Sequence, residues 1–375
     1  MRVLLTIHHH LDPNSGAPGV TWRLAQGLRA AGHEAETFSW DDLPARMDAR
    51  SRELLFPEFA ARRMARAGRE GVDVIDAASC DGWLWSLVRR GAGPALIARS
   101  HGLEQTFWDA RVEQATAGGD SVPLLERLYH GGVRLREARV SLRRSDAALF
   151  LNSADRARAV GELGVRAERA HVVANGVPDS LLGLPAPAPR GEGPLRLVQV
   201  GSWAARKGMH VLVEALAPLL EAPGPPRLTL LGTGVAAEEV LAAFPPGARE
   251  QVRVVPRYEH TELSALLREE HVLLLPSYAE GSSLALLEGM ACGLAPVVTR
   301  VGSAPDLLTD GEGGLLIPPG HSGALRAAVK RLADDPPLLE RLRERGHRDA
   351  QSFSWSRVTE DTVALYERVK AGTRA

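Results

Sequence analysis

The chain has 375 residues, more than one ordinary core requires, and its 24% charged and 45% hydrophobic residues are typical of a globular protein. A net charge of −1 excludes a general attraction to nucleic acid, and two cysteines in different halves exclude a disulfide framework. With no basic-then-apolar leader and no apolar run long enough for a bilayer, we expect a cytoplasmic protein.

Short β-prone runs alternate with stretches of helical spacing along the chain. Most runs are continuously apolar, as in strands buried on both faces of a parallel sheet. The first half holds Val3–Ile7, Glu34–Phe38, Val72–Ile75, Ala95–Ala98, Ala147–Leu151 and Val172–Ala174. The second half holds Leu195–Val200, Leu228–Leu231, Val252–Val255, Val272–Leu275, Pro296–Thr299 and Gly314–Ile317. This order predicts an α/β protein with two Rossmann-like domains.

A segment rich in proline and glycine separates the two series of runs. Residues 181–194, LLGLPAPAPRGEGP, hold four prolines and three glycines and are expected to be a linker. We therefore predict domains at 1–180 and 195–352, and a final helix at 353–375 that packs back on the first domain. Ligands of such sheets bind beyond the carboxyl ends of the strands, so the loops after the strands are the candidate sites, in a cleft between the domains.

The loop after the first strand begins with three histidines in a row. Neighbours in an extended segment face opposite ways, so a metal site would use His8, His10 and Asp12, but a polar strand end is the favoured interpretation. Gly16 and Gly19 follow, and they would let the start of a helix approach an anionic or hydroxylated ligand. A plain turn is the alternative, and the spacing is not that of a dinucleotide-binding motif.

Two further loops carry candidate ligand-binding side chains. His101 follows the fourth strand and precedes Gly102, although a structural turn histidine is the alternative. Arg206 and Lys207 precede a helix in the second half, and adjacent cations suit a diphosphate. An exposed basic pair is the alternative for these two residues.

The stretch LLLPSYAEGSSLALLEGMACGLAPVV is the most informative. Glu280 and Gly281 follow a strand, and a helix begins near Ser282 and Ser283, where free backbone amides form an anion site. Glu288 lies within the apolar part of this helix. A buried carboxylate needs polar partners, and ribose hydroxyls would be suitable ones; a solvent-facing glutamate is the alternative.

These motifs together resemble the retaining glycosyltransferases of family four, which have the GT-B fold of two Rossmann-like domains facing a central cleft. The E-x7-E spacing from Glu280 to Glu288 is followed by GMACGLAPVV and VGSAPDLLTDGEGGLLIPPG. ANGVP, VGSWAARKG, SHG and the Gly16 loop match in the same order. The chain departs from the common pattern at Ser202, at the Ser282–Ser283 pair and at Gly289, where alanine is usual.

The resemblance implies a metal-independent transfer of a sugar from a nucleotide-sugar donor, without a cofactor, and with retention of anomeric configuration. Arg206 and Lys207 would stabilise the departing diphosphate, Glu280 would hold hydroxyls of the transferred sugar, and His101 would contact that sugar. The other residues implied to bind substrate are Gly16, Asn175, Arg257, Tyr258, Gly281, Ser282, Ser283, Leu284 and Glu288.

The first domain would bind the acceptor, which is a glycan, a lipid-linked molecule or a small molecule. Two arginine-rich stretches, RRMARAGR and RLREARVSLRR, are candidates for peripheral membrane contact, although a solvated helix face is favoured. Two alternatives to a glycosyltransferase stay open. They are another GT-B-like sugar-nucleotide enzyme, such as an epimerase or a phosphorylase, and a non-catalytic nucleotide-sugar-binding protein.

Overall fold

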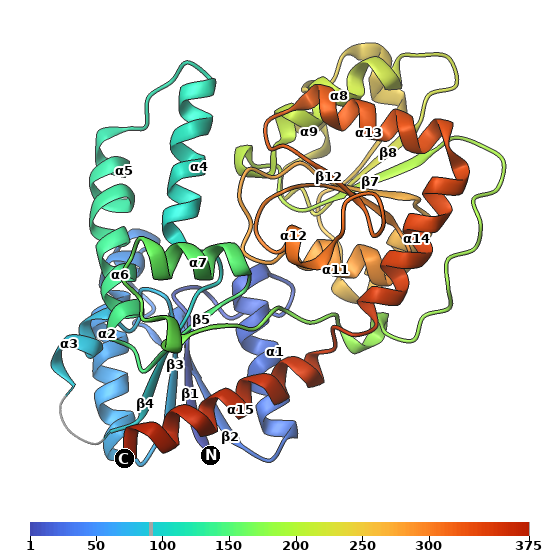
Figure 1. Ribbon diagram of the computed structural model, residues 1–375. Helices are drawn as coiled ribbons and strands as arrows, with labels where there is room; N and C mark the ends of the chain where they lie inside the picture. Colours follow the sequence, from blue (N-terminus) through green and yellow to red (C-terminus); the bar gives the residue numbers. More distant parts are fainter. Residues whose placement is uncertain (90–92, 375) are drawn as a thin grey trace. The chain divides into compact units, whose positions relative to one another are not determined.

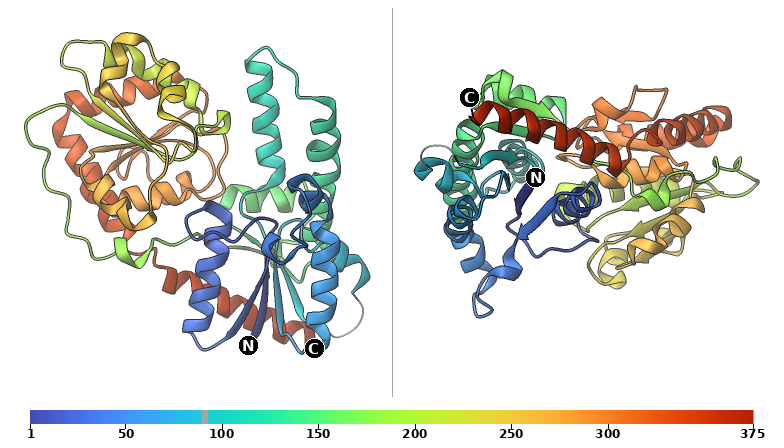
Figure 2. Two further views of the ribbon diagram at one scale, coloured as in Figure 1. Left: turned by 180° about the vertical axis from the view of Figure 1, so that it is seen from behind. Right: turned by 90° about the horizontal axis from the view of Figure 1, so that it is seen from below.

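The computed structural model describes residues 1–89 and 93–374 (Figure 1). The chain forms two compact units, one of Met1–Asn175 with Trp355–Ala375 and the other of Gly176–Ser354. Each unit is a parallel sheet flanked by helices, as Figures 1 and 2 show, so the predicted α/β class with two Rossmann-like units is confirmed. No helix in the described residues is long and apolar enough to cross a membrane.

The sheet of the first unit has the order β2-β1-β3-β4-β5-β6 in the described residues. Its strands are β1 (Arg2–Thr6), β2 (Glu34–Phe38), β3 (Val74–Ala78), β4 (Ala95–Arg99), β5 (Ala147–Phe150) and β6 (Ala170–Val172). Strand β6 begins two residues before the predicted run because Ala170 pairs with Ala148 and is buried. The carboxyl ends of all these parallel strands meet at one edge of the sheet.

Helices of the first unit include the chain's last one. They are α1 (Gly16–Ala30), α2 (Ala49–Arg69), α3 (Trp83–Val88), α4 (Glu104–Ala117), α5 (Leu124–Leu128), the π-helical turn η2 (Tyr129–Arg134), α6 (Leu135–Arg144), α7 (Ser153–Gly161) and α15 (Trp355–Arg374). Helix α15 packs on α1, and its Tyr366 hydroxyl donates to Asp76 at 2.5 Å. Asp76 also forms a buried ion pair with Arg99, at 2.6 Å. The C-terminal helix is therefore bonded to the core of the first sheet.

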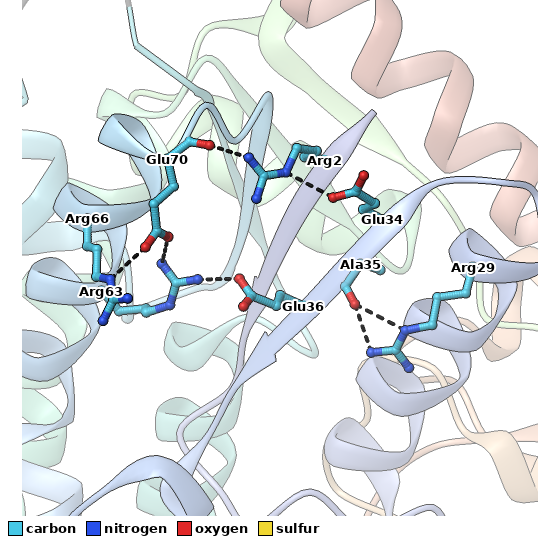
Figure 3. A network of polar contacts seen from close by, with 8 residues as sticks. All are labelled: Arg2, Arg29, Glu34, Ala35, Glu36, Arg63, Arg66 and Glu70. Atoms are coloured by element: carbon cyan, nitrogen blue, oxygen red, sulfur yellow. Dashed lines mark hydrogen bonds and ion pairs between the residues drawn. The ribbon is translucent and has the colours of Figure 1, made fainter.

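The edge strand β2 is covered by charged side chains (Figure 3). Glu34 accepts from Arg2 at 3.0 Å, and Glu36 pairs with Arg63 of α2. Arg63 also pairs with Glu70, at 3.2 Å. Exposed ion pairs contribute little to stability, but charges along an edge strand oppose pairing with another chain. Arg63, from the first arginine-rich stretch, is thus engaged within its own unit.

The sheet of the second unit has the order β12-β11-β10-β7-β8-β9 in the described residues. Its strands are β7 (Arg196–Val200), β8 (Arg227–Leu231), β9 (Val252–Val255), β10 (Val272–Leu275), β11 (Ala295–Thr299) and β12 (Leu315–Ile317). Its helices are α8 (Met209–Leu220), α9 (Ala237–Ala242), α10 (Leu263–Arg268), α11 (Leu284–Ala291), α12 (Ala304–Leu307), α13 (Ser322–Asp334) and α14 (Pro336–Ala350). Leu273 and Leu274 of β10 belong to core clusters on opposite faces of the sheet, which explains its continuous apolar sequence.

The segment 181–194, expected as a linker, lies within the second unit. Its start is fixed because Leu181 is buried in the core of that unit. Further along, Arg343 of α14 donates to the carbonyl of Ala188 at 3.0 Å. The boundary between the units therefore falls between Asn175 and Gly176.

Candidate active site

A glycine contact brings together the loops that follow β7 and β10 in the second unit. Gly208 has φ 72°, and a Cβ there would lie 2.0 Å from the carbonyl oxygen of Pro276. Only glycine satisfies both the left-handed backbone and this close approach. The preceding turn η5 (Ala205–Lys207) consequently lies against the loop after β10, and the amide of Tyr278 donates to the carbonyl of Arg206 at 2.8 Å.

Glu280 is held by both cations of this turn. Lys207 Nζ lies 2.6 Å from Glu280 Oε1, and Arg206 Nη1 lies 3.7 Å from Oε2. The Ser277 hydroxyl donates to Oε1 at 2.7 Å. Burial alone would raise the pKa of Glu280, but the charges of Lys207 and Arg206 and the hydrogen bonds outweigh it and lower that pKa. The site therefore joins a charged carboxylate to two cations at the carboxyl edge of the sheet.

The N-terminus of α11 lies beside this cluster. Ser283 caps the helix by accepting from the amide of Leu286, and Leu284 is the first helical residue. The Gly281 carbonyl accepts from the amide of Ser303 at 3.0 Å, a bond that joins the loop before α11 to the loop after β11. The hydroxyl of Ser282 is buried without a hydrogen-bond partner in the described part of the chain. The helix start thus offers backbone amides and an unsatisfied hydroxyl to a ligand.

Gly289, one of the departures from the usual pattern, has a packing reason. A Cβ at this position would lie 2.7 Å from Leu273 Cδ2 of β10. The glycine therefore allows α11 to approach the central strand closely, with the long side chain of Leu273 filling the space that an alanine would take.

Glu288 is buried in α11 and does not face solvent. Its side chain is 7% exposed, and His260 Nε2 lies 3.0 Å from Glu288 Oε1. Burial raises the pKa of Tyr258 to about 12, and the negative charge of Glu288 acts in the same direction. Arg257 is exposed in the same loop after β9. The carboxyl edge of β9 thus supplies one partner for Glu288, and the sequence reasoning missed His260 because it is 28 residues away.

The histidines after β1 turn to separate acidic partners. His8 Nδ1 lies 2.7 Å from Asp81, which follows β3, and His10 Nδ1 lies 2.6 Å from Asp41, which follows β2. Strands β2 and β3 flank β1 on opposite sides. Burial lowers the pKa of His9 to about 4, and the charge of His8 acts in the same direction. The residues described contain no group of three or more His, Cys, Asp or Glu placed to hold a metal ion.

His101 lies at the same edge of the first sheet with an unsatisfied ring nitrogen. Its Nδ1 is buried without a hydrogen-bond partner in residues 1–89 and 93–374. Burial is the main cause that lowers the pKa of His101 to about 3, and the charges of Arg99 and His8 act in the same direction. The imidazole is therefore neutral at neutral pH, and Nδ1 is available to a bound group.

Gly16 and Asn175 are the other predicted substrate-binding residues of the first unit. A Cβ at Gly16, the first residue of α1, would meet no atom within 4 Å, so packing does not require glycine there. Gly19 differs, because a Cβ would lie 3.0 Å from the Pro13 carbonyl oxygen. Asn175 is buried at the end of the first unit. The predicted site residues therefore fall into two groups, one in each unit.

Both units match models of one enzyme family. Residues 14–181 match "Glycosyltransferase Family 4", and residues 194–335 match "Glycosyl transferases group 1". The MMP alpha-(1->4)-mannosyltransferase of Mycolicibacterium hassiacum is 31% identical to the chain, over 100% of both proteins. The chain belongs to glycosyltransferase family four. These matches confirm the family and the enzyme class that the sequence motifs predict for this glycosyltransferase.

Solved structures of other proteins have the same fold as this chain. Sucrose-phosphate synthase from Thermosynechococcus elongatus covers 99% of the glycosyltransferase and 100% of its own chain, with a TM-score of 0.79 and 20% identity. Anabaena HepE in complex with UDP-glucose covers 98% of the glycosyltransferase and 100% of its own chain, with a TM-score of 0.70 and 15% identity. The glycosyltransferase therefore has the GT-B fold.

Proposed function

We propose that this glycosyltransferase transfers mannose or a related hexose from a nucleotide diphosphate donor to an acceptor hydroxyl, without a metal ion and with retention of anomeric configuration. The observation that carries the proposal is the cluster of Arg206, Lys207 and Glu280 beside the start of α11. The mannosyltransferase relative and the UDP-glucose complex of HepE support this choice of sugar and donor class.

The chemistry follows from where charge develops. When the anomeric C–O bond breaks, its electron pair goes to the departing diphosphate and the sugar ring becomes positive. Arg206, Lys207 and the amides of α11 are the groups proposed to stabilise the diphosphate, a role that a divalent metal ion fills in other transferases. The acceptor oxygen attacks on the same face of the sugar, and its proton passes to the leaving phosphate oxygen. Neither Glu280 nor Glu288 is used as a nucleophile.

The carboxylates are proposed to hold hydroxyl groups. Glu280 keeps its charge through Lys207, so its oxygens accept from hydroxyls of the transferred sugar. Glu288 accepts from the ribose, with Arg257 and Tyr258 beside the base. Gly281, Ser282, Ser283 and Leu284 supply the helix-start contacts to the sugar and the diphosphate. In the first unit, Gly16, His101 and Asn175 are proposed to bind substrate, His101 through its neutral ring.

A donor screen tests this function. Melting temperature is measured with UDP-, GDP- and ADP-sugars, and the best donor is then incubated with candidate acceptors while nucleotide release is followed. We expect one nucleotide family to stabilise the protein, and proton NMR of the product to show the anomeric configuration of the donor. Inversion of configuration, or activity abolished by EDTA and restored by a divalent ion, would contradict the proposal. If the product is a free or epimerised sugar with every acceptor, an epimerase is favoured. If sugar release depends on added phosphate, a phosphorylase is favoured.

A further inference from the structure

One face of the first unit carries an unusual concentration of exposed leucines. Leu125 and Leu128 of α5 are 72% and 59% exposed, and Leu54 of α2 is 45% exposed. In the described part of the chain, six of the ten large hydrophobic side chains that are exposed lie on α2, α5 and η2. A concentrated apolar patch of this kind marks a binding surface, whereas scattered exposed leucines do not.

Four of these six side chains line a hollow of about 470 Å³, which we call the leucine groove. Its apolar lining consists of Leu54, Leu125, Leu128 and Val133. The rest of the lining is formed by Arg50, Glu53, Glu126, Tyr129 and His130. This volume lies within the range of small-molecule sites, roughly 300 to 1,000 Å³. The concave shape favours a slender ligand over the broad self-complementary surface that a two-fold dimer uses.

The leucine groove lies close to the carboxyl edge of the first sheet. Phe56 of α2 contacts His8, with the two ring centroids 6.4 Å apart. Leu54 precedes Phe56 by a rise of about 3 Å along the same helix, but its side chain is exposed and lies on another side of α2 from the buried Phe56. On the other wall, His130 lies 4.0 Å from Glu53, which joins η2 to α2. The start of α2 thus presents Phe56 to the residues after β1 and Leu54 to the groove, with less than one helical turn between them. An acceptor that contacts the residues after β1 has only to extend around this turn to place an apolar part in the groove.

We infer that the leucine groove binds an apolar part of the acceptor, an alkyl, prenyl or aryl group joined to the hydroxyl-bearing end. The inference rests on the proposed function, in which the first unit binds the acceptor. The charges of the groove do not favour an anionic bilayer, because the carboxylates of Glu53 and Glu126 offset the guanidinium groups of Arg50 and Arg111 and leave no excess of positive charge. Glu126 is also held by Arg111 at 2.8 and 3.1 Å, so it is already paired within its own unit.

The test measures the affinity of methyl, hexyl and octyl β-D-glucopyranoside for the full chain by calorimetry, below their micellar concentrations and without donor. Burying one methylene corresponds to about a fourfold gain in affinity. We expect octyl glucoside to bind at least tenfold more tightly than the methyl glycoside. The double variant Leu125→Gln/Leu128→Gln is expected to remove this gain. Leu87→Gln, which changes a leucine of α3 that is 46% exposed, is the matched control and should keep it.

Three results would overturn the inference. The first is equal affinity of the wild type for the methyl and octyl glycosides, and the second is the same loss in the control and double variants. The third is that the double variant still binds octyl glucoside more tightly than methyl glucoside but has lost another property of the wild type. That property would be binding to vesicles of phosphatidylglycerol and phosphatidylcholine, or concentration-dependent dimerisation. Circular dichroism and nucleotide-induced melting shifts are recorded on the same samples. A wild type that binds no nucleotide would refute the proposed function. The difference in affinity between octyl and methyl glucoside would still show whether the leucine groove binds apolar groups.

Discussion

Removing the Lys207 ammonium tests the central element of the site. In Lys207→Ala the diphosphate loses one of its two proposed cations. The lost ammonium is only 15% exposed and lies 2.6 Å from a carboxylate that is 13% exposed, so water replaces it poorly. Loss of one preorganised donor costs about 3 to 4 kcal/mol of transition-state stabilisation. We therefore expect kcat to fall about 100- to 1,000-fold.

The same substitution also affects the folded state. Glu280 keeps its hydrogen bond from Ser277 and the guanidinium of Arg206 at 3.7 Å. Breaking a buried ion pair costs about 3 to 5 kcal/mol, and the remaining partners reduce this to about 1 to 3 kcal/mol. The pKa of Glu280 should rise, since the charge of Lys207 is the largest contribution that lowers it.

The assay follows nucleotide release at saturating donor and the melting temperature of each variant. Lys330→Ala is the matched control, because Lys330 is an exposed lysine of α13. A Lys207→Ala enzyme with kcat within about threefold of the wild type and a lowered melting temperature would show that Lys207 is structural only. The account of leaving-group stabilisation would then be refuted.

Three further predictions follow from the contacts of the two units. Glu288→Ala should weaken nucleotide binding at least tenfold in calorimetry while the circular dichroism spectrum is kept, and His260→Ala should weaken it less, with His260→Asn partly restoring it; unchanged affinity in Glu288→Ala removes this carboxylate from the site. Gly208→Ala should lower the free energy of unfolding by about 3 kcal/mol, because of positive φ and the contact with Pro276, against about 1 kcal/mol for Gly32→Ala, where φ is 82° and the space is open; equal losses in denaturant titrations contradict this. Because the pKa of His101 falls from 6.5 in the unfolded chain to about 3 in the folded one, the unfolded state binds more protons between these values, and stability declines as pH falls through that window. His101→Gln should therefore flatten the melting temperature between pH 6.5 and pH 4, and an unchanged slope would show that this histidine does not titrate as described.

The strands were predictable because their local sequence reports burial. Val272 to Leu275 is continuously apolar, and neighbouring residues of β10 do enter core clusters on opposite faces of the sheet. The location of the motif residues was predictable for a related reason, since parallel strands bring their carboxyl ends to one edge of the sheet. The order of strands along the sequence therefore indicated which loops lie at that edge.

Pairings between distant loops were not predictable in this way. His260 meets Glu288 across 28 residues, and His8 meets Asp81 across 73. Nothing in either local sequence specifies its partner, because the contact depends on which strands are neighbours. The segment 181–194 shows a different limit, since its composition indicates irregular backbone but not whether that backbone is free. A Cβ at Gly293 would lie 2.6 Å from Pro187, so this segment is packed against the rest of the second unit.

The return of α15 to the first sheet has a consequence for biosynthesis. Residues 176–354 are contiguous, so the second unit has all its strands and helices once the ribosome has passed them. The first unit is translated earlier but lacks the Tyr366 hydroxyl that Asp76 accepts until the last helix emerges. The half made first is thus the half completed last, and a premature stop before Trp355 would spare the later unit while leaving the earlier one unfinished.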